Sequence, residues 1–268
     1  MLENKLFYKK INMREYAALI SLQQLGLSHI TLPFECMETE IVMPCADPIS
    51  HRELSLSQIY RDCLKDLYSR KNDSFSPGIY AFYGSQEIPL GNDTYGTYLR
   101  RQIQDILNVV DKSQFEVIRT IAKFCRKSLS IGLERHYDSL NDLSKFSLLH
   151  GDLHTGNILI YHDQYKLIDF EFLRFGPRQL ELSFLMSWDY LSGEQAFPPT
   201  ADMIKTASCI AATFSLSKEE EQQIVDVFFP LIILLSIDGV NANRFANNTA
   251  FQKGLLSLYE RLLQEGEL

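Results

Sequence analysis

One stretch of the chain, Leu148 to Phe172, constrains the fold more than any other. It reads LLHGDLHTGNILIYHDQYKLIDFEF. Its two apolar runs, ILIY and YKLI, have the length and composition of short strands, and HDQ between them predicts a tight turn. A segment that only packed in a core would not carry histidines, carboxylates and an asparagine around such a hairpin. The stretch therefore predicts a loop and a hairpin that present polar groups.

The residue order within this stretch indicates which polar groups meet. Gly151 and Gly156 argue against a regular helix, so the segment before the hairpin is predicted to be a loop. Asn157 opens the first strand and Asp169 follows the second, so the hairpin brings them together, with Asp152 on the preceding loop. Oxygen ligands of this kind suit Mg²⁺. A separate carboxylate could orient or deprotonate an attacking hydroxyl, so the pattern favours phosphoryl transfer.

Two motifs in this stretch carry a family resemblance. Asp152 and Asn157 are separated by four residues, and Asp169 follows a strand, as in the kinase template. HGDLHTGNIL followed by LIDFEF resembles the aminoglycoside phosphotransferase and choline kinase superfamily, the small-molecule branch of the kinase fold. The resemblance implies that Asp152 is the catalytic base and that Asn157 and Asp169 hold Mg²⁺.

The resemblance also implies roles for three neighbouring residues. His150 would brace the catalytic loop, and Glu171 matches an acidic residue of choline-kinase-like members, which makes it a further metal candidate. Glu181 takes the place of an aspartate that usually ties down that loop. His150 and His154 are four residues apart, but the glycines argue against the helix that a zinc pair of this spacing requires. We expect His154 near phosphate or in solvent.

The N-terminal segment offers the phosphate-binding lysine that a kinase-like protein needs. Residues 5–10 are predicted to form a strand, so only one of Lys9 and Lys10 can face the nucleotide. We prefer Lys9, because the opposite choice would place it deeper on the packing face, where a charge is costly. Glu15 on the next helix is its predicted partner. Two solvated charges remain the alternative.

The next segment is predicted to contact the base of the nucleotide, which we expect to be ATP or GTP. Backbone groups from Met43 to Cys45, in IVMPCAD, would hydrogen-bond a purine edge. An ordinary edge strand and turn would look similar. Few residues precede Lys9 and the first glycine is Gly26, so this sequence lacks the family's glycine-rich loop over the phosphates. Weak nucleotide binding is therefore expected.

These elements together predict an α+β, two-lobed, protein-kinase-like fold. Residues 1–45 form a truncated, strand-rich, nucleotide-binding lobe, and residues 46–268 form a helical lobe with the catalytic loop and the acceptor site. The predicted strands are 5–10, 29–36 and 39–43. The predicted helices are 13–26, 53–70, 96–110 and 115–131, with a long loop over 71–95, a capping box at Ser217 and Glu220, and a buried helix at VFFPLIILL.

Composition excludes several classes of protein. The net charge is −8, and no basic stripe is present, so nucleic acid is not an expected partner. The five cysteines are scattered without a CxxC pair, which predicts core residues in a reducing compartment. The first ten residues contain no signal-peptide run, and the most apolar segment is too short to span a membrane. We therefore expect a cytoplasmic protein without a membrane partner.

The expected acceptor is a hydroxyl of a small molecule. The chain has no APE motif and no room for a peptide platform after Asp169. Trp188, Asp189 and Tyr190 are candidate substrate residues, because aromatic and acidic groups together can hold a cation; they could equally be core residues and a solvated aspartate.

The class of acceptor and the activity itself stay open. An aminoglycoside-, choline- or sugar-like alcohol is expected, and the acidic charge favours a cationic one. Arg174 and Arg178, near the metal loop, could instead bind an anion. The alternative to an enzyme is a non-catalytic nucleotide-binding or partner-binding pseudokinase. A homodimer, in which a second chain closes the site, is also left open.

Overall fold

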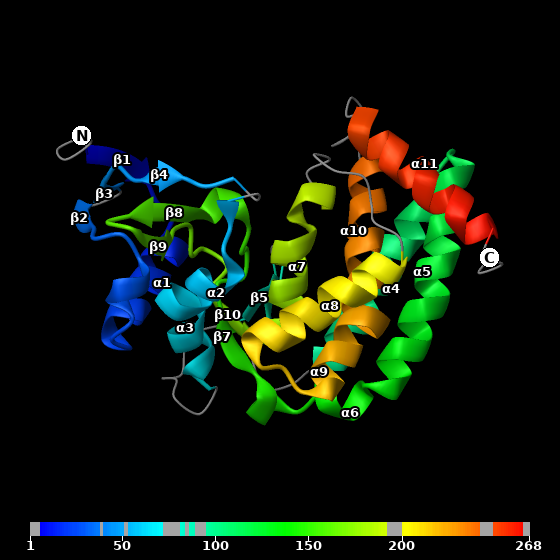
Figure 1. Ribbon diagram of the computed structural model, residues 1–268, viewed down its shortest axis with the longest axis horizontal. Coiled ribbons are helices and arrows are strands. Elements are labelled where there is room, and N and C mark those ends of the chain that lie inside the picture. Colours follow the sequence, from blue (N-terminus) through cyan, green and yellow to red (C-terminus); the bar gives the residue numbers. More distant parts are fainter. Residues whose placement is uncertain are drawn as a thin grey trace. The chain divides into compact units, whose positions relative to one another are not determined.

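The computed structural model describes residues 6–37, 40–50, 53–71, 81–83, 86–88, 95–191, 200–241 and 249–264. The chain divides into two compact units (Figure 1). Unit 1 comprises residues 1–90 and 143–181, and unit 2 comprises residues 91–142 and 182–268. Compact units need not coincide with functional lobes, so the lobe boundary at residue 45 stays a prediction.

The first sheet of unit 1 has three antiparallel strands in the order β1-β3-β2. These strands are β1 (Leu6–Lys10), β2 (Glu35–Met37) and β3 (Glu40–Pro44). Within the described residues β1 lies at an edge, where Leu6, Phe7 and Tyr8 are 57%, 52% and 59% exposed. Neighbouring residues of a strand point to opposite faces, so β1 is exposed on both faces.

Helix α1 (Met13–Gln24) follows β1, as predicted. Asn12 caps its N-terminus, because its side chain accepts hydrogen bonds from the backbone N–H groups of Arg14 and Glu15. The chain leaves the helix through Gly26, whose φ of +71° is the left-handed conformation that glycine adopts easily after a helix.

The strand predicted over 29–36 is wrong in its first half. Residues Ser28–Ile30 form a turn of 3-10 helix, η1, and the strand begins only at Glu35. The hydroxyl of Thr31 accounts for part of this difference, since it donates to the carbonyl oxygen of Ser28 and so closes the turn. Pro33 also lacks the N–H that a strand ladder uses.

The predicted hairpin is confirmed. Strand β8 (Ile158–Tyr161) pairs antiparallel with β9 (Gln164–Leu167), and β4 (Asp47–Pro48) pairs with β8. The turn contains two residues, His162 and Asp163, with φ of +50° and +59°, instead of the three residues HDQ. Two positive φ values in a two-residue turn match the twist of the strands, so β9 starts one residue earlier than predicted.

Unit 1 contains further helices and strands, of which η1 and η3 contact β9. The helix predicted over 53–70 is a continuous segment made of α2, η3 and α3, with a π-helical middle. The elements are α2 (Leu56–Ile59), η3 (Tyr60–Leu64), α3 (Lys65–Ser69), β5 (Ala81–Tyr83), β6 (Gln86–Ile88), η5 (Leu143–Lys145), β7 (Ser147–Leu149), η6 (Thr155–Asn157) and β10 (Arg174–Gly176). β5 and β6 pair, so the prediction of an unstructured loop is wrong there, because AFY has the aromatic content that favours strands.

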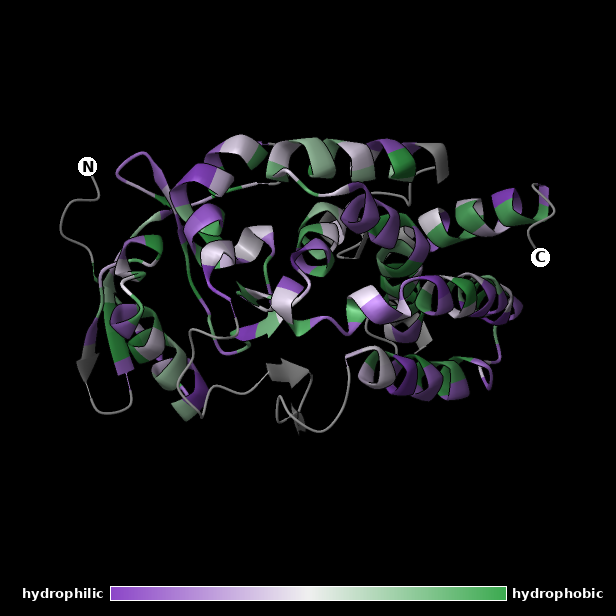
Figure 2. Ribbon diagram, turned by 90° about the horizontal axis from the view of Figure 1, so that it is seen from below, coloured by the Kyte–Doolittle hydropathy of each residue, from purple (hydrophilic) through white to green (hydrophobic). Residues whose placement is uncertain are grey.

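Unit 2 is helical in its described part, as expected for the larger part of the chain. Its helices are α4 (Tyr95–Val110), α5 (Glu116–Arg135), α6 (Tyr137–Leu140), α8 (Thr200–Phe214), α9 (Lys218–Gln223), η7 (Ile224–Phe228), α10 (Phe229–Asn241) and α11 (Thr249–Gln264), and α7 (Arg178–Leu191) runs from unit 1 into unit 2. α10 packs on α4 and α5. The helices carry both hydrophilic and hydrophobic residues (Figure 2). The predicted capping box at Ser217 and Glu220 is confirmed.

One helix in the described residues, Lys218–Gly239, is long and apolar enough to cross a membrane, and 72% of its most apolar window is buried inside the protein. The buried helix predicted at VFFPLIILL lies in it and is confirmed. Pro230 has no N–H to donate to Asp226, and the helix widens into the π-helical η7 just before this proline. The carbonyl oxygen of Asp226 lies against Gly132, where a Cβ atom would approach it to 2.3 Å.

The cysteines are only partly core residues. Cys63 and Cys125 are buried, and burial raises the pKa of the Cys63 thiol to about 12, so both are inert. Cys209 is exposed, and the prediction is wrong there, because this residue lies on the outward face of α8.

Candidate active site

Gly151 brings the predicted catalytic loop close to the segment that follows β9. Its φ is +92°, and a Cβ atom at this position would lie 1.9 Å from the carbonyl oxygen of Phe172. Any other residue would force the two segments apart. Glycine is therefore required here, between the predicted brace His150 and the predicted base Asp152.

His150 lies beneath the loop and is fully buried. Its Nε2 is 2.7 Å from the carbonyl oxygen of Ile168, and its Nδ1 is 3.3 Å from the backbone nitrogen of Asp152. Burial lowers the pKa of His150 to about 4, so the ring is neutral near pH 7. Nε2–H then donates to Ile168 and Nδ1 accepts from Asp152. A neutral histidine thus joins the loop to the end of β9, which is the geometry of a brace.

Glu181 holds the loop from the other side and is 3% exposed. It accepts a hydrogen bond of 2.6 Å from the backbone N–H of Gly151 and one of 3.0 Å from the hydroxyl of Tyr68. Burial raises the pKa of Glu181, although these hydrogen bonds and Arg174 act in the opposite direction. The contact with Gly151 is the one that the resemblance implied for this position.

Asp152, the predicted base, has a side chain 35% exposed. Its Oδ2 is 3.6 Å from Nε2 of His154, while Nδ1 of His154 accepts from the N–H of Gly156 over 3.1 Å. Burial alone would raise the pKa of Asp152, but His154, His150 and Arg174 outweigh it and hold this pKa below its usual range. The sequence reasoning missed this role of His154, although its position in HGDLH, two residues after Asp152, was the available signal.

Asn157 and Asp169 lie at the paired end of the hairpin. The backbone N–H of Ile168 donates to the carbonyl oxygen of Asn157 over 3.1 Å, so Asn157 lies opposite the residue that precedes Asp169. The Nδ2 group of Asn157 donates to the carbonyl oxygen of Asp152 over 2.8 Å, so Oδ1 is the atom that remains for a metal ion. Asp169 has a φ of +67°, and its side chain is 38% exposed.

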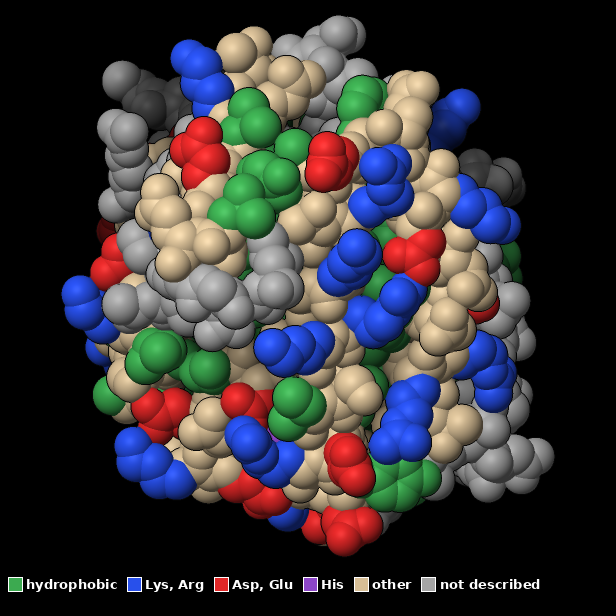
Figure 3. Space-filling model, turned by 90° about the vertical axis from the view of Figure 1, so that its right-hand side faces the viewer, with side chains coloured by type: hydrophobic (Ala, Val, Ile, Leu, Met, Phe, Trp, Pro, Cys, Tyr) green, Lys and Arg blue, Asp and Glu red, His purple; other side chains and the backbone are tan. Residues whose placement is uncertain are grey.

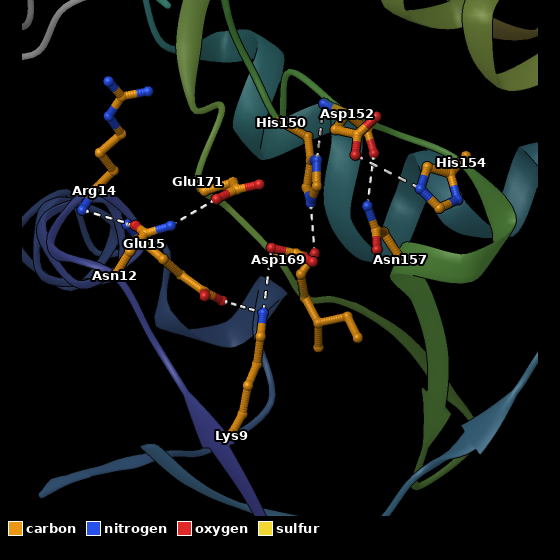
Figure 4. A network of polar contacts seen from close by, with 11 residues as sticks. Lys9, Asn12, Arg14, Glu15, His150, Asp152, His154, Asn157, Asp169 and Glu171 are labelled. Carbon is orange, nitrogen blue, oxygen red and sulfur yellow. Dashed lines mark hydrogen bonds and ion pairs between the residues drawn. The ribbon is translucent and has the colours of Figure 1, made fainter. Parts of the chain in front are cut away.

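Lys9 connects the first sheet to this loop (Figure 4). Its Nζ is 2.8 Å from Oε1 of Glu15 and 3.2 Å from Oδ1 of Asp169, whereas Lys10 is exposed. Burial raises the pKa of Glu15, Lys9 lowers it, and the negative charges of Asp169 and Glu171 raise it further. The structure therefore brings together Lys9, Glu15 and Asp169; their roles toward a nucleotide stay predictions.

Glu171 is a further carboxylate near Glu15, and it contacts the start of α1. Its Oε2 accepts a hydrogen bond of 2.7 Å from Nδ2 of Asn12. No three His, Cys, Asp or Glu side chains in the described ranges are arranged to hold a metal ion by themselves. Asp169, which pairs with Lys9, and the nearby residues Asn157 and Glu171 offer only oxygen donors to a metal ion. This set fits Mg²⁺, which takes few protein ligands and fills its shell with water and phosphate oxygens.

Among the described side chains, those of Met43 and Cys45 have no polar contact with this donor set. Met43 is buried in β3 and Cys45 follows that strand, half-buried. Trp188, Asp189 and Tyr190 lie in α7, but their side chains are outside the described part of the chain.

A groove of about 460 Å³ lies between α4 and α5 in unit 2. Lys and Arg side chains gather in a diagonal band on the face of the protein shown in Figure 3. Two arginines line the groove, but Arg126 pairs with Asp111 and Arg100 lies over the ring of Tyr137. These charges serve contacts within the unit, so the groove is a weaker candidate than the loop.

Comparison with known proteins identifies the fold. Residues 84–213 match the sequence model of a phosphotransferase enzyme family, APH. A solved aminoglycoside phosphotransferase from Alicyclobacillus acidocaldarius is 13% identical with a TM-score of 0.55, and the match covers 97% of this chain and 86% of that one. The resemblance is confirmed: this chain has the two-lobed α+β fold of the aminoglycoside phosphotransferase and choline kinase superfamily.

Two further solved structures show the breadth of this superfamily. A choline kinase from Cryptosporidium parvum is 13% identical with a TM-score of 0.52, covering 98% of this chain and 84% of that one. A further match is a thermostable mutant of the aminoglycoside phosphotransferase APH(4)-Ia, solved in ternary complex with AMP-PNP and hygromycin B. It is 13% identical with a TM-score of 0.57, and the match covers 97% of this chain and 86% of that one. No curated protein matches the sequence. The family match supports a small-molecule kinase.

Proposed function

We propose that this chain is an ATP-dependent phosphotransferase that acts on a hydroxyl of a small molecule. The observation that supports it most is the convergence of Lys9 from the first sheet on Asp169. Asn157, which is bonded to Ile168 just before Asp169, also holds the loop of Asp152. Phosphoryl transfer needs positioning and charge neutralisation above all, and these residues are of the types that supply both.

Asp152 is the proposed base. Its low pKa keeps it ionised near pH 7, so it orients the acceptor hydroxyl and takes its proton as the bond to phosphorus forms. The Nδ2 of Asn157 holds the backbone of Asp152, so the proposed metal ligand also positions the proposed base. Mg²⁺, when bound by Asn157, Asp169 and Glu171, would neutralise phosphate charge.

Lys9 is the proposed contact to the phosphates. It is 23% exposed and already paired with Glu15, which orients its ammonium group toward the loop. Met43 and Cys45 would place backbone groups against the purine, with ATP or GTP as nucleotide. AMP-PNP in the complex of APH(4)-Ia supports nucleotide use in this fold.

The proposed acceptor is a cationic or amine-bearing alcohol. The net charge of −8 favours it, and Trp188, Asp189 and Tyr190 would line its site. The similarity to choline kinases and to an enzyme solved with hygromycin B points the same way. Arg174 and Arg178 would favour an anionic acceptor instead, so both classes belong in the test.

A non-catalytic nucleotide-binding or partner-binding module is the second candidate. The observation that favours it is the exposed edge strand β1, which in the described residues has no further strand over it. If Lys9, the segment Met43 to Cys45 and the metal ion hold the nucleotide, we expect a dissociation constant for Mg·ATP of about 0.1–1 mM.

The deciding experiment measures ATP and GTP consumption with Mg²⁺ across aminoglycosides, choline, ethanolamine, neutral sugars and nucleosides. Turnover that requires both Mg²⁺ and one acceptor class supports the phosphotransferase, and a preference for amine-bearing acceptors that Asp189→Asn weakens supports the cationic site. Nucleotide binding by calorimetry without turnover on any acceptor favours the second candidate. If the protein neither binds nucleotide nor shows turnover, both candidate functions are contradicted.

A further inference from the structure

One side chain connects helix α1 to the predicted metal loop. Asn12 donates from Nδ2 to Oε2 of Glu171 over 2.7 Å. Through Oδ1 it also accepts from the backbone N–H groups of Arg14 and Glu15, at 2.9 Å each. Figure 4 shows Asn12 between the start of α1 and Glu171. A single amide therefore caps the helix and holds a carboxylate that lies two residues after Asp169.

The capping function alone does not require asparagine. Serine, threonine and aspartate cap helices about as well, because each offers an oxygen acceptor to the first N–H groups. Aspartate would place a carboxylate against Glu171, and the serine hydroxyl lies one bond closer to the backbone than the amide. Of these cap residues, asparagine is the one that adds an N–H donor at this reach. The bond to Glu171 is therefore a second property of Asn12.

The charges around Glu171 give this bond a purpose. Lys9 divides its ammonium group between Glu15 and Asp169. The negative charges of Asp169 and Glu171 both raise the pKa of the buried Glu15, so each of these two carboxylates repels Glu15. A neutral donor at Asn12 counters this repulsion without adding a cation that would compete with a metal ion. Asn12 thus fixes the carboxylate of Glu171 at the start of α1.

We propose that Asn12 is a positioning residue that holds Glu171 ready for Mg²⁺ and couples the metal loop to α1. This inference rests on the proposed function. The same helix carries Glu15, the partner of Lys9, so one cap connects the metal loop to the element that orients the phosphate-binding lysine. Mg·ATP should therefore bind more tightly with Asn12 than with another cap residue at this position.

The test compares nucleotide affinity with and without the metal ion. Calorimetry gives the dissociation constants of ATP in Mg²⁺ and in EDTA for the parent protein, Asn12→Ser and Asn12→Asp. Both variants keep a capping oxygen, so their unfolding midpoints should stay near that of the parent. The gain in ATP affinity from Mg²⁺ should fall by about two- to tenfold in both variants, because the exposed hydrogen bond from Asn12 to the charged Glu171 is lost. The fall should be larger in Asn12→Asp. The affinity in EDTA should not change.

A reversed pair distinguishes positioning from capping. In the double variant Asn12→Asp with Glu171→Gln, the amide and the carboxylate exchange places, so the hydrogen bond can form in the opposite direction. We add the losses of Mg·ATP binding free energy that the two single variants show. The double variant should lose less than this sum. Ser217→Ala serves as the control, since it removes a helix cap in unit 2 and should lower stability without changing the Mg²⁺ dependence.

Each outcome decides the matter. Any of three results would show that Asn12 only caps α1. The Mg²⁺ dependence of ATP affinity is unchanged in Asn12→Ser, or the affinity falls equally in EDTA, or the losses in the double variant are strictly additive. A parent protein that binds ATP no better with Mg²⁺ than with EDTA overturns the proposed metal site and this inference with it. A parent that responds to Mg²⁺ while its variants match it overturns this inference alone.

Discussion

The two sides of the candidate site in unit 1 are built differently. On the loop side, His150 is fully buried and Glu181 is 3% exposed, and both bond to backbone groups of other segments. On the N-terminal side, Lys9 and Asn12 reach their partners with side chains that are partly or fully exposed, and Met13 next to them is 79% exposed.

This difference predicts different consequences of mutation. Breaking a buried hydrogen bond leaves a desolvated group unpaired, whereas an exposed pair loses little because water replaces the partner. The loop side should therefore be fixed before any ligand arrives, and its residues should matter for stability or for turnover. The N-terminal side should be adjustable, and its residues should matter for binding.

The largest expected effect is at Asp152, whose side chain is half-buried on the loop side. Asp152→Asn removes the proposed base while its neighbours hold the loop, so turnover should fall by about 10²–10⁴-fold, or roughly 3–5 kcal/mol of barrier. Steady-state kinetics with the accepted substrate measures the loss, and calorimetry should show nearly unchanged Mg·ATP affinity. Near-normal turnover would remove Asp152 from this role.

Glu181 tests whether the loop side is built for stability. Glu181→Ala leaves the N–H of Gly151 and the hydroxyl of Tyr68 without their partner, so the free energy of unfolding should fall by about 2–4 kcal/mol. Glu181→Gln should cost much less, since its oxygen can accept from Gly151 while its amide donates to Tyr68. Denaturant unfolding measures both, and equal losses would contradict the hydrogen-bond account.

The pH dependence of stability in the parent and in Glu181→Gln makes this test sharper. Burial raises the pKa of Glu181 in the folded state, so folding favours the protonated carboxyl. That contribution is complete below the unfolded-chain pKa of about 4.3 and is lost as the pH rises through the folded pKa. Glu181→Gln has no such titration, so its stability relative to the parent should increase across this window. A constant difference would mean that the pKa is not raised.

Asp169 lies where the two sides meet. Asp169→Ala removes a proposed metal ligand and one partner of Lys9, so the Mg²⁺-dependent part of nucleotide binding should be abolished, a loss of about 10–100-fold. The variant should still fold, because the side chain is 38% exposed. Calorimetry in Mg²⁺ and in EDTA measures the change, and an unchanged Mg·ATP affinity would exclude this residue as a ligand.

The smallest effect is expected on the N-terminal side. Lys9→Ala removes the ammonium group between Glu15 and Asp169, so Mg·ATP affinity should fall by about tenfold. Lys10→Ala is the matched control, since Lys10 is exposed on the same strand. If both variants bind alike, the strand lysines do not contact the phosphates.

Local rules were sufficient for the hairpin and for the helix ends. Residues 158–167 consist of two short strand-forming runs around a turn, and Ser217 with Glu220 forms a capping box within four consecutive residues. They failed for 29–36, where a short 3-10 turn and a strand compete within the same apolar composition. They also failed inside 71–95, where the pairing partner of a three-residue strand decides whether it forms.

The candidate site shows the same division. The proximity of Asp152, Asn157 and Asp169 could be predicted from their spacing, because a hairpin brings its own ends together. The choice of Lys9 over Lys10 was only a preference, and the contact of Asn12 with Glu171 was not expected at all. Such contacts join segments far apart in the chain, and no periodicity reports them.

From the sequence by itself, the hairpin, the glycine-containing loop before it and the polar groups of both could be predicted. The reason is that backbone conformation and short-range pairing depend on neighbouring residues. Only the tertiary structure decided that His150 is neutral, that Glu181 supports Gly151, and that Lys9 and Asn12 reach the loop. The physical reason is that burial and long-range contacts fix the pKa and the partner of each polar group, and both arise only when distant segments pack together.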